Sequence, residues 1–440
     1  MTGDVGRAIW FAVVGALALL APLLEGRVSD LVAAVGTVAP FVVVAAVAFM
    51  TTSGPLFDSL ARPGDREEGR LYGLASFSLG IAGLAVIYAA FDLPVSAFLV
   101  AVFVLTVGNL GQAVVATYRP DPVVGTSAFA VVGTVGAIGA ILLAGVLGAS
   151  VPALPLAVFV ATSGALLGAL IRSVLFMRDD SLVVLSVGLV VWFLLELDLV
   201  PTARRIGIGL ALTAALGYVA YGLGTASVTG MLTGVLLALF TVVLGGFGWF
   251  VLLVTFFGLG GLASKYRYEE KLDRGIAQEN EGARGGGNVL ANSAVALVAV
   301  VAFAVSGQIG VPSSVFLFAF AGAVAAALAD TFSSEFGGLF DTPRLITTLR
   351  EVEPGTDGAV TWQGVVAGII GSAIIGGLSG LFFGLEVPGV MLVVLAGAVG
   401  MTVDSLLGAA LEGVYLGNQG VNLLATLSAG LVAGLAALGL

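Results

Sequence analysis

Long apolar runs, each about the length that crosses a lipid bilayer, alternate along this chain with short polar segments. A transmembrane helix needs about 20 mostly apolar residues. The runs are continuous and rich in Leu, Ala and Gly, whereas barrel strands alternate apolar and polar residues. The sequence therefore predicts an all-α polytopic membrane protein with about 15 transmembrane helices, in a range of about 13–17. The predicted spans are 8–24, 31–50, 71–91, 94–117, 123–147, 151–176, 182–200, 205–224, 227–245, 246–263, 289–306, 311–329, 363–383, 388–411 and 422–440.

The apolar block 227–263 is counted as two of these helices. As one helix, its roughly 37 residues would extend roughly 55 Å at 1.5 Å per residue. The cluster from Gly245 to Gly248 supplies the turn that splits it.

Composition limits the chemistry available to this chain. Hydrophobic residues make up 59% and charged residues 10%, and there is no cysteine or histidine. Thiol nucleophiles, Cys/His zinc sites and imidazole bases are therefore excluded. A general base would have to be Asp, Glu or Lys, and a bound metal would be a hard, oxygen-bound ion such as Mg²⁺. The net charge of −10 argues against a nucleic-acid partner, which would require a basic surface.

The distribution of polar residues divides the chain near residue 204. We interpret 1–204 as a transmembrane extension and 205–440 as the functional domain, because polar motifs are dense only in the second part. Residues 107–136 loosely resemble 328–367, without the acids. A degenerate internal repeat and a chance similarity between Ala/Gly/Val-rich helices are both compatible with this likeness.

Basic residues set the expected orientation in the cell membrane. The arginine-rich loop 51–70 is placed in the cytoplasm by the positive-inside rule, whereas Arg204 and Arg205 fall on the opposite side, against the rule. If 227–263 crosses twice, all the polar loops of the second part face the cytoplasm and can form one composite site. These loops are 264–288, 330–362 and 412–421.

The first polar loop combines cations, glycines and two asparagines. Asn288 and Asn292 lie four residues apart, on one helical face at a membrane entry. Glycines 285–287 let backbone amides approach an anion at a helix start, where phosphate is favoured. Lys265 and Arg284 offer positive charge, although the alternative is that such cations only anchor a helix at the interface.

The second polar loop begins with acids at a span end and continues into a glycine turn. Asp330, Thr331 and Glu335 are functional candidates because ionisable residues in a transmembrane bundle are costly; the alternative is an interfacial helix stop with exposed acids. Arg344 offers bidentate recognition of phosphate, and the Thr347 hydroxyl offers a donor. A tight turn is predicted to expose backbone amides and one carboxylate. Its residues are Gly355, Thr356, Asp357 and Gly358.

The third group surrounds the start of the last helix. Asp404 lies inside a span, in a stripe of fourfold spacing with Gly400, Gly408 and Glu412, and we expect it to face a polar site. Asn418 and Asn422 are further candidates, with a turn and a helix cap as the alternative. Acids, cations and glycine turns at one membrane face are the parts of Mg²⁺-dependent phosphoryl or nucleotidyl transfer.

Taken in order, these motifs resemble the DUF92 family. The resemblance rests on Asn288-Val-Leu-Ala-Asn292, Ala329-Asp330-Thr331 with Ser334-Glu335-Phe-Gly337, Pro343-Arg344-Leu-Ile-Thr347-Thr348, Pro354-Gly355-Thr356-Asp357-Gly358, Asp404-Ser405-Leu-Leu-Gly408 and Asn418 with Val421-Asn422. It covers roughly 205–440, so the chain looks like an archaeal type with an N-terminal extension. Gln419 stands where the family pattern suggests an acid.

The resemblance implies a Mg²⁺-dependent kinase that transfers a phosphoryl group from CTP or another NTP to a prenyl (phytyl or geranylgeranyl) phosphate, since the family includes a plant phytyl-phosphate kinase. It also implies roles for the candidate residues. Metal binding and catalysis would fall to Asp330, Glu335 and Asp404, with Asp357 as a further catalytic acid. Phosphates would be bound by Lys265, Arg284 and Arg344, and the nucleotide pocket would be shaped by Asn288, Asn292, Asn418 and Asn422.

Two alternatives use the same parts. A transporter of a lipid or small anion would place its site near the bilayer midplane, often between inverted repeats. A CTP-dependent lipid cytidylyltransferase would differ only in which phosphate is attacked. The expected partner is in each case a membrane lipid, an isoprenoid or a small anion.

Overall fold

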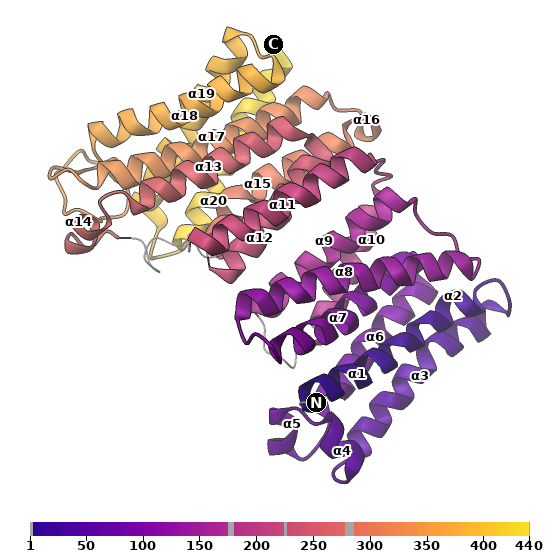
Figure 1. The fold of residues 1–440 in the computed structure, drawn as a ribbon. Helices are drawn as coiled ribbons and strands as arrows, with labels where there is room; N and C mark the ends of the chain where they lie inside the picture. The colour runs from indigo at the N-terminus through magenta and orange to yellow at the C-terminus, as the bar shows by residue number, and fades with distance from the viewer. Residues whose placement is uncertain (1–2, 175–179, 224–226, 278–285, 440) are drawn as a thin grey trace. The chain divides into compact units, whose positions relative to one another are not determined.

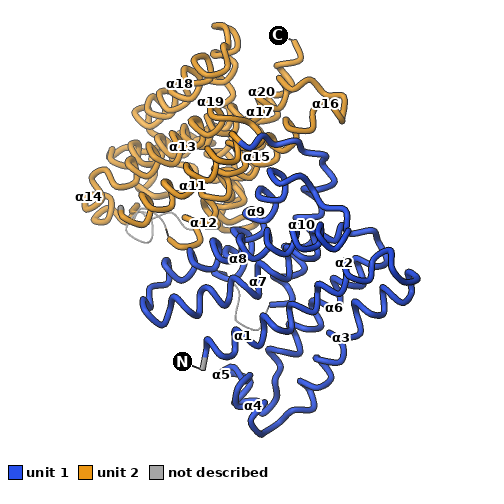
Figure 2. Tube along the Cα trace, turned by 45° about the vertical axis from the view of Figure 1, so that its right-hand side comes forward, with its two compact units in different colours: residues 1–203 blue, residues 204–440 orange. Residues whose placement is uncertain are grey.

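The chain forms two compact units, residues 1–203 and 204–440 (Figure 2). The computed structural model describes residues 3–174, 180–223, 227–277 and 286–439. Within them, 14 helices are long and apolar enough to cross a membrane, and α10 adds a shorter apolar helix of 17 residues. The prediction of an all-α polytopic membrane protein is confirmed.

Unit 1 is built around α7, which contacts α1, α8, α9 and α10 (Figure 1). Glycines on α7 allow the close contact with α8, because a Cβ atom on Gly111 would lie 2.6 Å from the Cβ of Val132. The elements of unit 1 are α1 (Gly3–Ala16), η1 (Leu17–Leu19), α2 (Leu20–Leu24), α3 (Asp30–Met50), α4 (Pro55–Leu60), α5 (Pro63–Glu68), α6 (Tyr72–Ala90), α7 (Val95–Ala116), α8 (Pro122–Val146), α9 (Leu154–Val174) and α10 (Asp180–Glu196).

Unit 2 is built around α17, which contacts α13, α15, α18, α19 and α20. Its elements are α11 (Ala203–Leu223), α12 (Val228–Phe240), η2 (Thr241–Gly245), α13 (Phe247–Lys265), α14 (Tyr268–Asp273), α15 (Gly286–Ala304), α16 (Ser306–Ile309), α17 (Ser313–Gly337), β1 (Arg344–Leu345), β2 (Ala359–Val360), α18 (Trp362–Phe383), α19 (Val387–Leu411), α20 (Asn418–Ala436) and η4 (Ala437–Gly439). The two short strands pair antiparallel inside the segment that joins α17 to α18.

The break predicted inside the block 227–263 is confirmed. The first helix ends in a widened turn, η2, and the next begins at Phe247. Gly246 has a φ of 106°, a conformation that glycine adopts without the steric cost of a Cβ atom. The two helices are therefore separate spans.

Small residues let five helices surround α17. On the side of α20, a Cβ atom on Gly322 would lie 2.7 Å from the Cβ of Ala433. On the side of α18, a Cβ atom on Gly371 would lie 3.0 Å from the carbonyl oxygen of Leu328. Backbones that approach this closely gain van der Waals contact, which holds helices together in lipid. The same packing carries α17 past residue 329, where the predicted span ended, to Gly337.

Replacing Gly322 by valine should separate α17 from α20. Over-packing a tight core costs about 1–3 kcal/mol, so Gly322→Val should lower the thermal unfolding midpoint of the purified protein in detergent. Gly377→Val is the matched control, because a Cβ atom there has no neighbour within 4 Å. Equal unfolding midpoints for the two variants would contradict the close packing of α17 against α20.

Candidate functional site

A polar cavity of about 390 Å³ lies in unit 2 where α17 and α19 end and where α15, α18 and α20 begin. All three polar loops of the sequence contribute to its lining. Most of the predicted site residues meet there: Asn288, Asn292, Asp330, Thr331, Gly355, Thr356, Asp357, Gly358, Asp404, Asn418 and Asn422.

Asp330 and Asp404 form the deepest acidic pair of the cavity. A Cβ atom on Gly400 would collide with the Cβ of Ala326, so α19 and α17 touch one helical turn before the two acids. One turn further along each helix, the carboxyl groups of Asp404 and Asp330 are hydrogen-bonded to each other. Two carboxyl groups that are close enough to hydrogen-bond are stable together only if they share a proton or a cation.

Glu412 and Asp357 form a second acidic pair, which also depends on a close contact at a glycine. A Cβ atom on Gly408 would lie 3.0 Å from the backbone nitrogen of Gly358, which brings the glycine turn onto α19. Burial and the charge of Asp357 raise the pKa of Glu412, and a hydrogen bond with Asn418 opposes this rise. Glu412 was not among the predicted site residues, although its eight-residue spacing from Asp404 placed it on the same helical face.

The asparagines form two similar pairs at helix starts. Nδ2 of Asn292 donates to the carbonyl oxygen of Asn288 at 3.0 Å, and Nδ2 of Asn422 donates to Oδ1 of Asn418 at 3.0 Å. These bonds fix the amides at the first turns of α15 and α20, where backbone N–H groups are unpaired and attract anions. A Cβ atom on Gly287 would lie 2.5 Å from Nε2 of Gln419, so the two helix starts are adjacent.

The turn from Gly355 to Gly358 forms one wall of the cavity. Gly355 has a φ of 85° and Gly358 a φ of 73°, which glycine alone adopts without strain. The Thr356 hydroxyl donates to the carbonyl oxygen of Glu353 at 2.7 Å, which closes the turn. The side chain of Ile276 fills the space between this turn and the end of α17. Its Cγ2 atom lies 3.1 Å from where a Cβ atom on Gly355 would stand, and its Cδ1 atom lies 2.7 Å from where a Cβ atom on Gly338 would stand.

The structure places Glu335 away from the cavity. This carboxylate does not line the cavity; it is buried in an ion pair with Nζ of Lys271, at 2.6 Å, and accepts a hydrogen bond from the Ser264 hydroxyl at 2.8 Å. Lys271, a residue that the sequence analysis did not select, also donates to the carbonyl oxygen of Ala263 at 2.7 Å. Glu335 therefore fixes α14 against α13 and α17.

Two of the three cations expected to bind phosphate lie outside the described lining of the cavity. Lys265, Arg344 and Thr347 are exposed and lie outside its lining. Arg344 instead donates to the carbonyl oxygen of Leu349 at 3.0 Å and belongs to β1. Arg284 lies outside the described residues.

The described lining therefore carries four carboxylates and no lysine or arginine. No three carboxylates among the described residues come close enough to bind a metal ion by themselves. Oδ2 of Asp404 is nevertheless buried without a hydrogen-bond partner in the described part of the chain, next to the Asp330 carboxyl group. Such a pair fits Mg²⁺, which binds through one or two carboxylates and completes its shell with water and substrate phosphates.

Known proteins resemble the second unit of this chain. Residues 211–430 match the family described as "Integral membrane protein DUF92". An uncharacterized membrane protein of Methanocaldococcus jannaschii, MJ0933, is 40% identical over 190 residues, which are 42% of this chain and 75% of that protein. No solved structure matches.

Two plant proteins are also similar. Protein VTE6, chloroplastic, of Arabidopsis thaliana is 31% identical over 206 residues, 45% of this chain and 61% of the relative. Protein PGR of the same plant is 33% identical over 189 residues, 38% of this chain and 65% of the relative. The family match lies within unit 2 and leaves unit 1 uncovered.

Breaking the buried ion pair should strongly destabilise unit 2. Glu335→Gln leaves the Lys271 ammonium buried without its counter-charge, which costs about 3–5 kcal/mol and should lower the unfolding midpoint sharply. The double variant Lys271→Met/Glu335→Met should be more stable than Lys271→Met alone or Glu335→Met alone. Asp341→Asn is the control, because it removes an exposed pair with Arg274 worth about 0–1 kcal/mol. Additive effects in this double-mutant cycle would exclude the coupling.

The raised pKa of Glu412 predicts a pH-dependent stability. The folded protein holds this proton more tightly than the unfolded chain, so the contribution is complete below the ordinary glutamate pKa of about 4.3. It is lost as the pH rises through the raised pKa. Unfolding midpoints across pH should therefore fall more steeply for wild type than for Glu412→Gln. Glu386→Gln, an exposed change at the start of the same helix, should keep the wild-type slope.

Proposed function

Because this chain belongs to the DUF92 family of integral membrane proteins, we propose that unit 2 is a prenyl-phosphate kinase. It transfers the terminal phosphoryl group of CTP or another nucleoside triphosphate to an isoprenoid monophosphate. The bond between that phosphorus and the nucleoside diphosphate breaks, and a bond forms to an oxygen of the prenyl phosphate. The products are a prenyl diphosphate and a nucleoside diphosphate.

The observation that carries this proposal is the acidic cavity itself. Asp330 and Asp404 share one hydrogen bond, and Oδ2 of Asp404 is buried without a partner among the described residues. The four carboxylates of the described lining would repel a phosphate, so a cation bound beside them would favour the entry of substrates that bear phosphate. Mg²⁺, when bound by Asp330 and Asp404, supplies the positive charge that neutralises the phosphate oxygens during transfer.

Neutral donors of the same cavity complete the recognition of phosphate. The Asn pairs at the starts of α15 and α20 and the Gly355–Gly358 turn line the cavity. Helix starts and turns of this kind offer backbone N–H groups to an anion. These groups hold phosphates without adding charge. Two walls of donors around one acidic pair suit two phosphate-bearing substrates placed end to end.

An apolar groove beside the cavity suits the prenyl chain. It has a volume of about 360 Å³, and its lining is mostly apolar, with Phe336, Leu339, Val366 and Ile370, but also includes Arg267 and Gln363. Phe340 lines both the groove and the polar cavity, so the two spaces adjoin. A prenyl phosphate bound here would leave its tail on α17 and α18 and its phosphate beside Asp330.

The position of the acids favours an enzyme over a transporter. Asp330 and Asp404 lie in the last turns of their helices, at the end of the bundle, whereas transporter sites lie near the bilayer midplane on broken helices. We further propose that this end faces the cytoplasm, where nucleotides are available. A cytidylyltransferase would use the same residues but would release pyrophosphate and a CDP-lipid.

The decisive experiment supplies purified full-length protein with Mg²⁺, CTP or ATP, and phytyl or geranylgeranyl monophosphate. Wild type should form the prenyl diphosphate, identified by mass spectrometry. Asp404→Asn and Asp330→Asn should each lower the rate about 100-fold or more, because each removes a carboxylate from the metal-binding pair. Asp341→Asn, an exposed change of the same kind outside the cavity, should retain the wild-type rate.

Three outcomes separate the hypotheses. A CDP-lipid with pyrophosphate as products would replace the kinase by a cytidylyltransferase. No turnover by folded protein with any donor and prenyl phosphate would reject both enzymes and favour transport. Turnover that survives both Asp→Asn changes would move the active site away from this cavity.

A further inference from the structure

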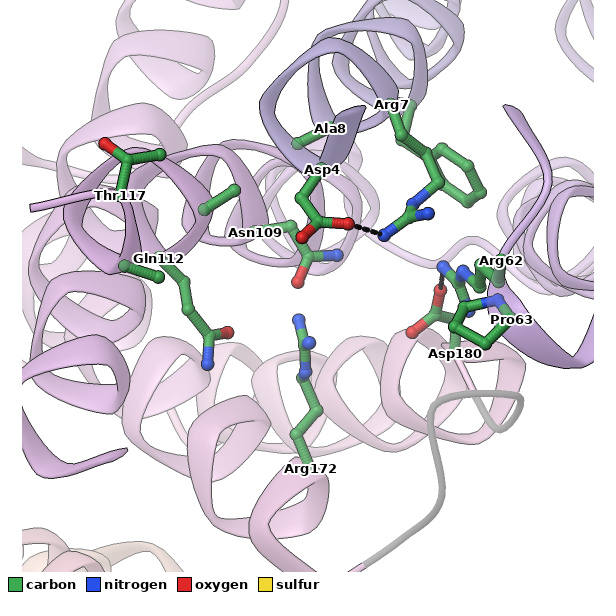
Figure 3. Close-up of a pocket in the computed structure, with 13 residues that line it drawn as sticks. Asp4, Arg7, Ala8, Arg62, Pro63, Asn109, Gln112, Thr117, Arg172 and Asp180 are labelled. Carbon is green, nitrogen blue, oxygen red and sulfur yellow. Dashed lines mark hydrogen bonds and ion pairs between the residues drawn. The ribbon is translucent and has the colours of Figure 1, made fainter. Parts of the chain in front are cut away.

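Unit 1 contains a separate cavity of about 450 Å³, outside the residues that match the family (Figure 3). It lies between the start of α1, the start of α5, the ends of α7 and α9, and the start of α10. The charged side chains of its described lining are three arginines and two aspartates: Asp4, Arg7, Arg62, Arg172 and Asp180.

Two of these arginines already have carboxylate partners. Arg7 pairs with Asp4 at 2.5 Å, and Arg62 pairs with Asp180 at 2.5 Å. Backbone and ring contacts hold both guanidinium groups further, since Arg7 donates to the carbonyl oxygen of Ala61 at 3.2 Å and Arg62 lies 4.8 Å above the ring of Phe11. The two aspartates of the described lining each pair with an arginine, and Asp180 also lies near enough to attract Arg172.

Arg172 is the cation that these pairs leave over. Its guanidinium lies 4.8 Å from the ring centre of Phe129, and its Nη1 atom is buried without a hydrogen-bond partner among the described residues. Figure 3 shows the side chain extending from α9 into the cavity. Arginine stays protonated in proteins, and the described lining has three arginines for two aspartates, so one positive charge lacks a carboxylate of its own.

Two amide side chains supplement the arginine. Asn109 and Gln112 lie three residues apart near the end of α7 and line the same cavity, and Figure 3 shows both beside the space that Arg172 enters. The side-chain N–H groups of both amides and of the planar guanidinium form a set of several hydrogen-bond donors. A halide ion would leave part of this set unused. A tetrahedral oxyanion accepts several donors at once and suits a guanidinium fork.

The helices around this cavity pack in the same pattern as those around the acidic cavity. In unit 1, α7 contacts α8, α9 and α10; in unit 2, α17 contacts α18, α19 and α20. Each cavity lies where the first and third helix of its set end and the fourth begins. Asp404 lies on α19, the third helix of the set in unit 2. Arg172 lies on α9, the third helix of the set in unit 1.

We propose that the unit 1 cavity is a phosphate-binding site with Arg172 as its principal ligand. The ligand is a phosphate group, either free in solution or carried by an anionic lipid. This site is independent of the kinase cavity, because all its lining residues belong to unit 1. It binds phosphate directly, without a divalent cation.

The test measures the thermal unfolding midpoint of the full-length protein in EDTA, so that cation-dependent phosphate binding in unit 2 is suppressed. One arm adds inorganic phosphate in detergent; the other compares nanodiscs of phosphatidylcholine with nanodiscs that also contain phosphatidic acid. Wild type should gain several degrees in at least one arm. A rise only with phosphatidic acid identifies a lipid ligand, and a rise with inorganic phosphate identifies the free anion.

Variants of Arg172 separate binding from folding. Arg172→Gln should lose the phosphate-dependent rise, yet should unfold no earlier than wild type without phosphate, because it removes one of three buried positive charges that share two aspartates in the described lining. Arg172→Lys should weaken phosphate binding about tenfold, since lysine keeps the charge but not the fork. Arg119→Gln, an exposed change in the same unit, should respond like wild type.

The proposal fails if neither phosphate source stabilises wild type. It also fails if Arg172→Gln retains the full response, or if its stability falls equally with and without phosphate. In that last case Arg172 serves only to pack against Phe129.

Discussion

The close backbone contact between α17 and α19 is the constraint on which the candidate site depends. No Cβ atom fits at Gly400, so the two helices touch at Ala326 and continue side by side for one more turn. That turn brings Asp404 against Asp330. The contact between Gly408 and Gly358 repeats this arrangement nearer the rim and brings Asp357 toward Glu412. Glycine spacing therefore sets the distances between the acids, because helices that lacked these glycines would hold the carboxylates apart.

Two acidic residues on α17 have different surroundings in this unit. Asp330 lines a cavity beside other acids, while Glu335, five residues later on the same helix, is neutralised by Lys271. Side chains five residues apart point about 140° away from each other on a helix, so they meet different surroundings. The ion pair keeps α14 and Ile276 against the end of α17, and Ile276 in turn supports the glycine turn of the cavity. One acid thus takes part in the site and the other stabilises its frame.

Apolar runs and glycine clusters were sufficient to predict the fold, including the break at Gly246, because span length and turn formation are local properties. Local spacing also identified Asp330, Asp404 and the asparagine pairs as candidates. It did not indicate that Lys271, and not Lys265, is the buried lysine. The burial of Lys271 depends on the chain reversal at Arg267, a non-glycine residue with a φ of 51°. It likewise missed the capture of Glu335, because an ion pair between residues 64 positions apart leaves no periodic signal.

The two units show how one helix arrangement can present opposite charges. In each unit a central helix packs against the three that follow it, and a cavity opens where the first and third helices of the set end. In unit 2 the charged side chains of the described lining are four acids, and Oδ2 of Asp404 is buried without a partner in the described chain. In unit 1 the atom in that situation is Nη1 of Arg172. A buried charge without a counter-charge is costly in either sign. Under the two proposals, the first cavity would take a cation together with its phosphate and the second would take phosphate directly, so the same helix arrangement would bind different ligands through a few side chains at the helix ends.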